Sequence, residues 1–386
     1  MGTKLFIPKW RKHFGFIECY QNRTIVFRDT ADHWSNALCR LLNLSDAQAK
    51  NWVCAVLEQA VYSYGRSFVE LSYSQKLEIL RKASYKFFKI NTKRVSSLAE
   101  NHNRLSWCRH NPDIEWVPYL WEDRDYAVIG CSKCVHGWLA PVHKLVKHIK
   151  NDALYDREYF EGNLKDKGYG NYLQQMPWRI EKSHRLFKQI EGVARYLNLR
   201  MNKKPRALDI GSGYGFFRKI LDEAKWRHDG IEVSRYAAEV CKQTYGYNTF
   251  VGRIDEYRKR CMASYDLITL WDVIEHLKDP INQLKHIFAL LKTEGICVMR
   301  TPNLMAVERD IFGPHYHSLK REHLHYFSAE SLVSALNQDG LKTLFLTSES
   351  HLLSGFFGVD FSFASCLLKG SDLFVVAGKQ KDNNSD

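Results

Sequence analysis

From residue 206 onward, short apolar runs alternate with longer amphipathic segments, and this alternation constrains the fold more than any other feature. Strands that alternate with helices in this way predict an α/β fold, in which helices cover both faces of a parallel, doubly wound sheet. The seven predicted strands are ALDI (207–210), GIEV (230–233), TFV (249–251), YDLITLW (265–271), GICVMR (295–300), KTLFLT (342–347) and SDLFVVAG (371–378).

Polar residues ahead of the helical segments predict where several helices begin. Ser234 can cap a helix that ends near Gly246, and Ser328 can cap the last helix of the chain. Asp279 can act as an N-cap with Pro280 at the first helical position. Strand and helix signals therefore agree along this half of the sequence.

The amino-terminal third, residues 1–105, is predicted to be a basic and mainly helical accessory domain. Apolar side chains recur at helical spacing over 36–44, 47–64 and 75–88. Residues 1–106 contain 17 Lys and Arg against 8 Asp and Glu, which gives +9 of the chain's net charge of +13. Such a surface can bind an acidic partner or an anionic surface, or it can serve solubility alone.

Cysteine usage and hydropathy bear on the compartment. The ten cysteines are scattered without the spacing of a small disulfide-rich domain, which favours a reducing environment. No run approaches the roughly 20 apolar residues that a bilayer span needs. Charges and Pro8 interrupt residues 1–16, so these residues lack the apolar centre of a secretory signal. We therefore expect a cytoplasmic protein without a transmembrane segment.

The first predicted strand ends on Asp209, and Gly211, Gly213 and Gly215 follow it. Glycines at this spacing indicate that something approaches the backbone too closely for a Cβ atom. A dinucleotide-binding turn would place its third glycine one residue later, where this chain has Phe216. The Asp209 carboxylate is also poorly suited to a pyrophosphate, whereas it suits a cationic amino group. A nicotinamide oxidoreductase is therefore disfavoured.

The D-x-G-x-G-x-G turn after a strand, with Glu232 ending the next strand, resembles the class I S-adenosylmethionine-dependent methyltransferases. The resemblance covers residues 150–378. It implies a seven-stranded Rossmann-like methyltransferase core at 201–380, with a cap insert at 301–327. Three further segments resemble the small-molecule branch of this family in order and spacing: YDLITLWDVIEHLKDP (265–280), LLKTEGICVMRTPN (290–303) and REHLHYFSAESLVSALNQDGL (321–341).

The resemblance implies that S-adenosyl-L-methionine is the cofactor. Glu232 would accept hydrogen bonds from both ribose hydroxyls, and Asp209 would help to place the amino group through water. Arg253 stands where the family's acid for the adenine is expected, so this contact is assigned to Asp255, two residues further on. The predicted cofactor-binding set is Asp209, Gly211, Ser212, Gly213, Tyr214, Gly215, Glu232, Val233, Asp255, Trp271 and Asp272, the last two near the sulfonium.

A hydroxyl acceptor needs a base, and histidine is the usual choice near neutral pH. The candidates are His276, His323 and His325, although each can instead be a packed, hydrogen-bonded histidine that shapes the pocket. The stretch GPHYHSLKREHLHYF (313–327) carries four imidazoles that could bind a metal ion. We expect this stretch to form a short cap over the substrate instead.

Residues 151–200 resemble the lid and leading helix that precede the core in this branch. The stretch 152–172 is rich in tyrosine, and 179–197 has the pattern of a long amphipathic helix. Glycines in the tyrosine-rich stretch would allow such a lid to move. The tyrosines can close over the cofactor or simply pack.

Residues 106–150 are predicted to contain a β-hairpin that leads into Cys131-x-x-Cys134. This pair resembles the second half of a zinc knuckle, and only Cys108 and His110 are available for the first half. A zinc site and reduced cysteines packed in a hairpin both remain open at this point.

Together these features predict methyl transfer to a small or medium-sized acceptor, with an oxygen of a sugar, glycolipid or secondary metabolite as the methylated atom. One alternative is a cofactor-binding pseudoenzyme that uses residues 1–105 as a docking surface. Another is a nucleic-acid-modifying methyltransferase whose basic domain binds phosphates. The chain has no arginine-rich tract and no N-P-P-Y-type tetrapeptide after the fourth predicted strand, which disfavours a base methylase.

Overall fold

The structure is a computed structural model that describes most residues from 155 onward and selected segments before them. The predicted helix 36–44 and three residues of the suggested zinc site, Cys108, His110 and Cys134, lie outside the described residues. The described residues are 16–19, 25–28, part of 48–71, 73–87, 116–120, 126–131, 135–141, 155–162, 171–199, 202–261, 263–313, 316–338, 340–349 and 368–379.

The chain divides into two compact units, and the division does not follow one cut in the sequence. Unit 1 contains residues 1–96, 305–319 and 349–371, and unit 2 contains the remainder. The prediction of an accessory domain at 1–105 did not include the two later segments, because they lie within the stretch assigned to the core.

Unit 1 has helical and strand parts. A helix predicted at 75–88 is confirmed as α3 (Tyr73–Phe87), whereas the hairpin of β1 (Phe16–Cys19) and β2 (Ile25–Arg28) was not foreseen in a mainly helical region. The buried Trp52 indole donates a hydrogen bond to Ser84 in α3 at 3.0 Å.

A second element of unit 1 comes from far along the sequence. Helix α10 (Val307–Phe312) brings the buried Phe312 ring to 5.5 Å from the Trp52 ring, measured between centroids. An aromatic contact between residues 260 positions apart therefore explains why the 305–319 segment groups with the amino-terminal region.

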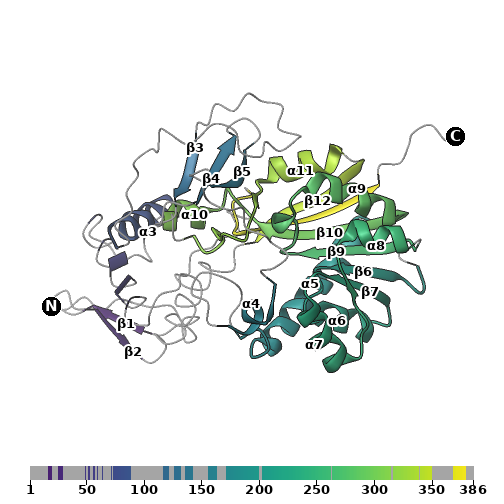
Figure 1. The fold of residues 1–386 in the computed structure, drawn as a ribbon. Coiled ribbons are helices and arrows are strands. Elements are labelled where there is room, and N and C mark those ends of the chain that lie inside the picture. The colour runs from purple at the N-terminus through teal and green to yellow at the C-terminus, as the bar shows by residue number, and fades with distance from the viewer. Residues whose placement is uncertain are drawn as a thin grey trace. The chain divides into compact units, whose positions relative to one another are not determined.

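Unit 2 is built on a seven-stranded sheet, and all seven predicted strands are present (Figure 1). The strands are β6 (Arg206–Ile210), β7 (Arg227–Glu232), β8 (Phe250–Val251), β9 (Tyr265–Trp271), β10 (Leu291–Pro302), β12 (Leu341–Glu349) and β13 (Asp372–Lys379). Their order is β12-β13-β10-β9-β6-β7-β8.

One strand departs from the predicted parallel sheet. The pairs β6–β7, β6–β9, β7–β8 and β9–β10 are parallel, but β13 runs antiparallel to β10, from Ile296 opposite Gly378 to Pro302 opposite Asp372. The predicted doubly wound sheet is therefore confirmed, and its parallel arrangement holds for these four pairs but not for β13. The first strand, β6, lies between β7 and β9, so strand order reverses there and leaves a crevice at the strands' carboxyl ends.

Helices join and cover these strands, and their predicted caps are confirmed. The Ser234 hydroxyl accepts a hydrogen bond at the start of α7 (Arg235–Tyr245), which ends at Gly246. Asp279 caps α9 (Pro280–Leu290) with Pro280 in its first turn. The Ser331 N–H donates to the Ser328 hydroxyl at 3.1 Å at the start of α11 (Ala329–Gln338).

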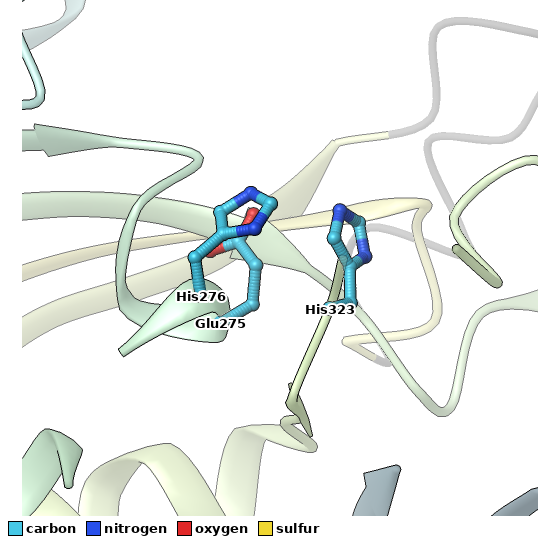
Figure 2. A group of neighbouring side chains, drawn as sticks. All are labelled: Glu275, His276 and His323. Atoms are coloured by element: carbon cyan, nitrogen blue, oxygen red, sulfur yellow. The ribbon is translucent and has the colours of Figure 1, made fainter. Parts of the chain in front are cut away.

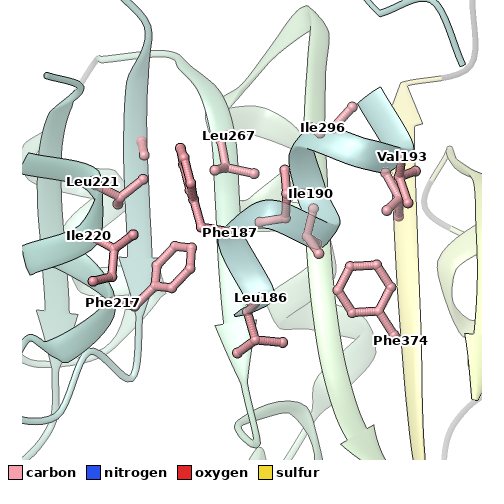
Figure 3. Close-up of a cluster of buried hydrophobic side chains, with 13 residues drawn as sticks. Leu186, Phe187, Ile190, Val193, Phe217, Ile220, Leu221, Leu267, Ile296 and Phe374 are labelled. Carbon is pink, nitrogen blue, oxygen red and sulfur yellow. The ribbon is translucent and has the colours of Figure 1, made fainter. Parts of the chain in front are cut away.

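The main core of unit 2 lies between the sheet and two helices, α5 (Met176–Tyr196) and α6 (Phe216–Glu223). Figure 3 shows the α5 side chains Leu186, Phe187 and Ile190 directed toward residues of the sheet and of α6. Ile190 and Leu267 are 1% and 0% exposed, so this contact excludes water from the back of the sheet.

A smaller sheet completes unit 2. Its strands are β3 (Trp116–Leu120), β4 (Tyr126–Cys131), β5 (His136–Pro141) and β11 (His325–Tyr326), in the order β11-β5-β4-β3. The β4–β5 pair is the hairpin predicted within 106–150. No described helix is long and apolar enough to cross a membrane.

Candidate functional site

A cavity of about 290 Å³ opens in unit 2 where strands β6, β7 and β9 end. Gly211 and Gly213 follow β6, Glu232 ends β7, and Trp271 ends β9, and all four residues line the cavity. This is the edge of the sheet at which the change in strand order predicts a ligand site.

Neighbouring side chains, rather than a ligand, require glycine at two positions of the turn after β6. Gly211 and Gly215 have φ angles of +69° and +82°, which side chains rarely adopt. A Cβ on Gly211 would lie 2.5 Å from Val273 Cγ2, and one on Gly215 would lie 2.5 Å from Cys241 Sγ. At these two positions the close approach inferred from the sequence is therefore made by neighbouring side chains. A Cβ on Gly213 would lie 3.4 Å from the Tyr172 hydroxyl, an ordinary contact, so of the three glycines Gly213 alone has room for a side-chain atom.

Glu232 joins the end of β7 to this turn. Its carboxylate accepts hydrogen bonds from the backbone N–H groups of Gly213, at 2.8 Å, and Ser234, at 2.9 Å. The side chain is only 5% exposed, and this burial raises the pKa of Glu232 although both hydrogen bonds oppose the increase. The carboxylate is thus fixed in place while it still faces the cavity.

Asp209 lies beneath the turn rather than along the cavity wall. It is 1% exposed and accepts a hydrogen bond from the Thr269 hydroxyl of β9 at 2.7 Å. Burial raises the pKa of Asp209 to about 7. This carboxyl therefore joins two adjacent strands at their ends.

The predicted cofactor residues divide into two groups in the structure. Six of them line the cavity: Gly211, Gly213, Glu232, Val233, Trp271 and Asp272. The other five lie outside the set of described residues that line it: Asp209, Ser212, Tyr214, Gly215 and Asp255.

Arg253, rather than Asp255, lines the cavity at the start of α8 (Ile254–Arg260). Arg253, which stands where the resemblance led us to expect an acid, is therefore the residue of this segment that borders the site. Asp255 lies in the first turn of the helix, and its proposed adenine contact stays a prediction.

Trp271 and Asp272 lie in different surroundings. The Trp271 ring packs against Phe217, with 5.0 Å between centroids, so it belongs as much to the core as to the cavity. Asp272 adopts a left-handed conformation with φ of +56° and receives a hydrogen bond from Arg300. Arg300 also donates to Asp372 at 3.2 Å.

Sequence reasoning missed Arg300 and Lys182 as neighbours of Asp272. Lys182 Nζ lies 3.9 Å from the Asp272 carboxylate, and burial together with Arg300 lowers the pKa of Lys182 to about 8. Arg300 pairs with Trp271 in the parallel register of β10 and β9, so correct alignment of these two predicted strands would have placed it beside Asp272. The sequence holds no comparable signal for Lys182.

Aromatic residues from the tyrosine-rich stretch line another wall of the cavity. Tyr155, Tyr159, Phe160 and Tyr172 all contribute to it, two of them from α4 (Arg157–Glu161). The Arg179 guanidinium lies 3.7 Å from the centre of the Tyr172 ring, a cation–π contact. The stretch predicted as a lid thus supplies apolar rings to the site.

The three candidate catalytic histidines are not equivalent. His276, in the short helix η4 (Ile274–His276), lines the cavity, and its Nδ1 donates to the Glu322 backbone carbonyl at 2.9 Å. Because a carbonyl only accepts, the neutral ring carries its proton on Nδ1 and its lone pair on Nε2. His323 is 5% exposed, and its ring centroid lies 4.8 Å from that of His276.

His325 lies in β11 and is not among the described residues that line the cavity. Its Nδ1 lies 3.3 Å from His136 Nε2 of β5, and burial lowers the pKa of His325 to about 4. The structure therefore gives His325 a place in the packing of the small sheet, which is the alternative considered for each histidine. Of the other two imidazoles in this stretch, His317 belongs to unit 1 and His315 lies outside the described residues.

Of the suggested zinc ligands, the structure describes Cys131 alone, as a buried residue at the end of β4. A zinc site at Cys108, His110, Cys131 and Cys134 stays a prediction.

Residues 172–345 match the family described as a methyltransferase domain. A ubiquinone biosynthesis O-methyltransferase from Haemophilus ducreyi is 28% identical over 107 residues, which cover 25% of this chain and 45% of that protein. Its counterpart from Actinobacillus pleuropneumoniae serotype 7 is 30% identical over 122 residues, which cover 29% of this chain and 52% of the relative. The chain thus spans about half the length of the curated relatives it matches.

A solved S-adenosylmethionine-dependent methyltransferase from Archaeoglobus fulgidus is also similar. The alignment covers 54% of this chain and 99% of that protein, at 18% sequence identity and a TM-score of 0.41.

The family match defines the class of this part of the chain: residues 172–345 form a methyltransferase domain, in agreement with the resemblance noted in the sequence. S-adenosyl-L-methionine is the cofactor that this resemblance implies.

We predict that Gly215→Ala destabilises the protein more than Gly246→Ala. Both glycines have left-handed φ angles, +82° and +75°, so both substitutions carry a backbone cost of about 1–2 kcal/mol. A Cβ at Gly246 meets open space, whereas one at Gly215 meets Cys241 and adds an overpacking cost of about 1–3 kcal/mol. Urea denaturation of the two variants measures the difference. Equal loss of unfolding free energy would contradict the packing described for the turn.

We also predict a pH-dependent effect at Asp209. Aspartate in an unfolded chain titrates near pH 3.9, and folding raises this pKa to about 7 against the opposing charge of Arg218. Stability from the protonated carboxyl is therefore complete below about pH 4 and is lost as the pH rises through 7. Asp209→Asn should accordingly raise the unfolding temperature relative to the unsubstituted protein more at pH 8 than at pH 5.

The matched control is Asp222→Asn, because that side chain is 62% exposed. Thermal denaturation at both pH values provides the measurement. An identical pH response in the two variants would show that Asp209 is not shifted.

Proposed function

We propose that this protein transfers a methyl group from S-adenosyl-L-methionine to a hydroxyl oxygen of a small or medium-sized acceptor, such as a sugar, glycolipid or secondary metabolite. One observation carries the proposal. The cavity that presents Gly213 and Glu232, the residues suited to the cofactor, also presents His276, which is suited to a hydroxyl group. Cofactor and acceptor groups would thus meet in one enclosed place, as displacement at carbon requires.

The residues present fit the cofactor. The Glu232 carboxylate has about four acceptor positions; the Gly213 and Ser234 N–H groups use two and the Val233 backbone also hydrogen-bonds to it, so about one position remains for a ribose hydroxyl. Gly213 presents backbone without a side chain toward the cavity, where the methionine part would lie. When bound, S-adenosylmethionine supplies a methyl group whose carbon–sulfur bond breaks as the acceptor oxygen bonds to carbon, leaving S-adenosylhomocysteine and one proton.

The acceptor hydroxyl would be activated at the cluster of Glu275, His276 and His323 (Figure 2). His276 is the member that can act on an acceptor, because it lines the cavity. Its Nδ1–H bond to the Glu322 carbonyl orients the ring and places the basic lone pair on Nε2. His323, packed edge to face on His276, would position that ring.

Two further features support oxygen transfer to a small acceptor. The rings of Tyr155, Tyr159, Phe160 and Tyr172 would exclude water from the reacting groups. The curated relatives are O-methyltransferases by name.

The basic residues 1–105 would serve as a surface for an acidic partner or an anionic surface. The scattered cysteines favour a cytoplasmic location.

We predict that Glu232→Gln weakens binding of S-adenosylhomocysteine by about tenfold or more, because one charged acceptor for the ribose hydroxyls is lost. Asp255→Asn, the matched change at an acid that does not line the cavity, should leave the affinity within about twofold. Isothermal titration calorimetry gives both affinities. Loss at Asp255 with none at Glu232 would remove the ribose assignment and restore the sequence-based adenine contact.

We predict that His276→Ala lowers methyl transfer by about 100-fold or more while it changes S-adenosylhomocysteine affinity by less than about threefold. Transfer of tritiated methyl from S-adenosylmethionine to a panel of phenols and methyl glycosides provides the assay. His184→Ala is the control, because His184 lies 47% exposed on α5. Tight binding of S-adenosylhomocysteine by unsubstituted protein that transfers no methyl group to any panel member would favour the pseudoenzyme alternative.

A further inference from the structure

Three metal-ligating side chains meet beside the cavity: Glu275, His276 and His323 (Figure 2). One donor atom from each lies within 4.8 Å of the other two. Glu275 and His276 are neighbours in η4, and the Leu324 N–H donates to the Glu275 carbonyl oxygen at 2.9 Å. This backbone bond keeps the segment that carries His323 next to η4, so the cluster is built into the fold.

Glu275 holds a buried oxygen that has no partner. The residue is 1% exposed, and the Thr301 hydroxyl donates to Oε2 at 3.0 Å. No group in the described part of the chain donates a hydrogen bond to Oε1. Burial of an unpaired carboxylate oxygen is unfavourable, because the oxygen loses its hydration without compensation. A cation bound between Glu275 and the two histidines would provide that compensation.

The His276 ring is already arranged as a metal ligand requires. Histidine ligands usually donate the N–H that faces away from the metal to a carbonyl or carboxylate, which fixes the tautomer. The Nδ1–H bond of His276 to the Glu322 carbonyl, 2.9 Å long, has this form and leaves the lone pair on Nε2.

Charge around the cluster also suits a cation. The nearby guanidinium of Arg300 is occupied by Asp272 and Asp372. The carboxylates of Asp272 and Glu322 both act electrostatically on His276, and they add negative potential on the side of the imidazoles. Lys320 is a positive charge that acts on the same ring.

We propose that Glu275, His276 and His323 bind a divalent first-row transition-metal ion, such as Mn²⁺ or Zn²⁺. A carboxylate oxygen with two imidazole nitrogens is a donor set that such ions accept and that leaves coordination positions open. Bonds of about 2.0–2.2 Å place the donors of a tetrahedral ion roughly 3.3–3.6 Å apart. Donor atoms that lie within 4.8 Å of one another therefore need to close by at most about 1.5 Å when the ion binds.

The position of the ion would give it a role in the reaction. Because His276 lines the cavity, an open coordination position could take the acceptor hydroxyl, whose proton is lost more readily once the oxygen is metal-bound. With the ion in place, His276 would activate the hydroxyl through the metal that its Nε2 holds, instead of accepting the proton itself. This role rests on the proposed function, whereas metal binding itself does not.

The test uses the full chain without an affinity tag, stripped with EDTA and returned to chelator-free buffer. Manganese is the probe, because cysteine thiolates bind it weakly and a site at Cys131 would not interfere. Loss of the free Mn²⁺ electron paramagnetic resonance signal measures binding, and we expect one equivalent. Glu275→Gln, which retains an acceptor for Thr301, and His323→Ala should each weaken binding about tenfold or more. His184→Ala, the surface histidine control, should bind as the unsubstituted protein does.

A measurement on unsubstituted protein keeps the test independent of variant folding. Bound Mn²⁺ should broaden the NMR ring signals of His276 and His323 before those of His184. The proposal is overturned if no manganese binds, if these signals broaden alike, or if folded Glu275→Gln and His323→Ala proteins bind as tightly as the unsubstituted protein. Binding of manganese without binding of S-adenosylhomocysteine would overturn the proposed function and leave the metal site standing.

Discussion

The hydrogen bonds that the Glu232 carboxylate accepts from Gly213 and Ser234 hold the whole cavity edge in register. They join the end of β7 to the turn after β6 and to the start of α7, three elements that the change in strand order brings together. Without that junction, the glycine turn would lose its connection to the neighbouring strand. Because the carboxylate is buried, loss of either N–H donor would leave a charged oxygen without a hydrogen bond, which is unfavourable.

The strand positions could be predicted because each is a short apolar run that ends at a polar residue or glycine. Trp271, Asp272 and Glu232 line the same cavity because the carboxyl ends of parallel strands meet at one edge, whereas their contacts with a cofactor stay a prediction. The direction of β13 could not be predicted in the same way. Apolar runs have the same composition in either direction, and the long connection before β13 gives no local signal of its antiparallel pairing with β10.

The candidate catalytic histidines show a different limit of sequence reasoning. His323 and His325 are two residues apart and read alike, yet one lies against His276 and the other against His136. His325 lies in β11 and pairs with β5, whereas His323 precedes that strand. The two side chains therefore have different neighbours. Asp209 shows the complementary limit: its position at the end of the first strand was evident, but its burial beneath the turn depends on Thr269 of another strand.

The pairing of β11 with β5 and of β13 with β10 affects where the methyltransferase domain begins and ends. The segment that matches the family, residues 172–345, contains β10 and β11 but lacks β13, which covers one edge of β10, and β5, which pairs with β11. A protein trimmed to that segment would present two bare strand edges, which invite association between chains. We therefore expect a stably folded form of this domain to extend upstream to the hairpin at 126–141 and downstream to residue 379.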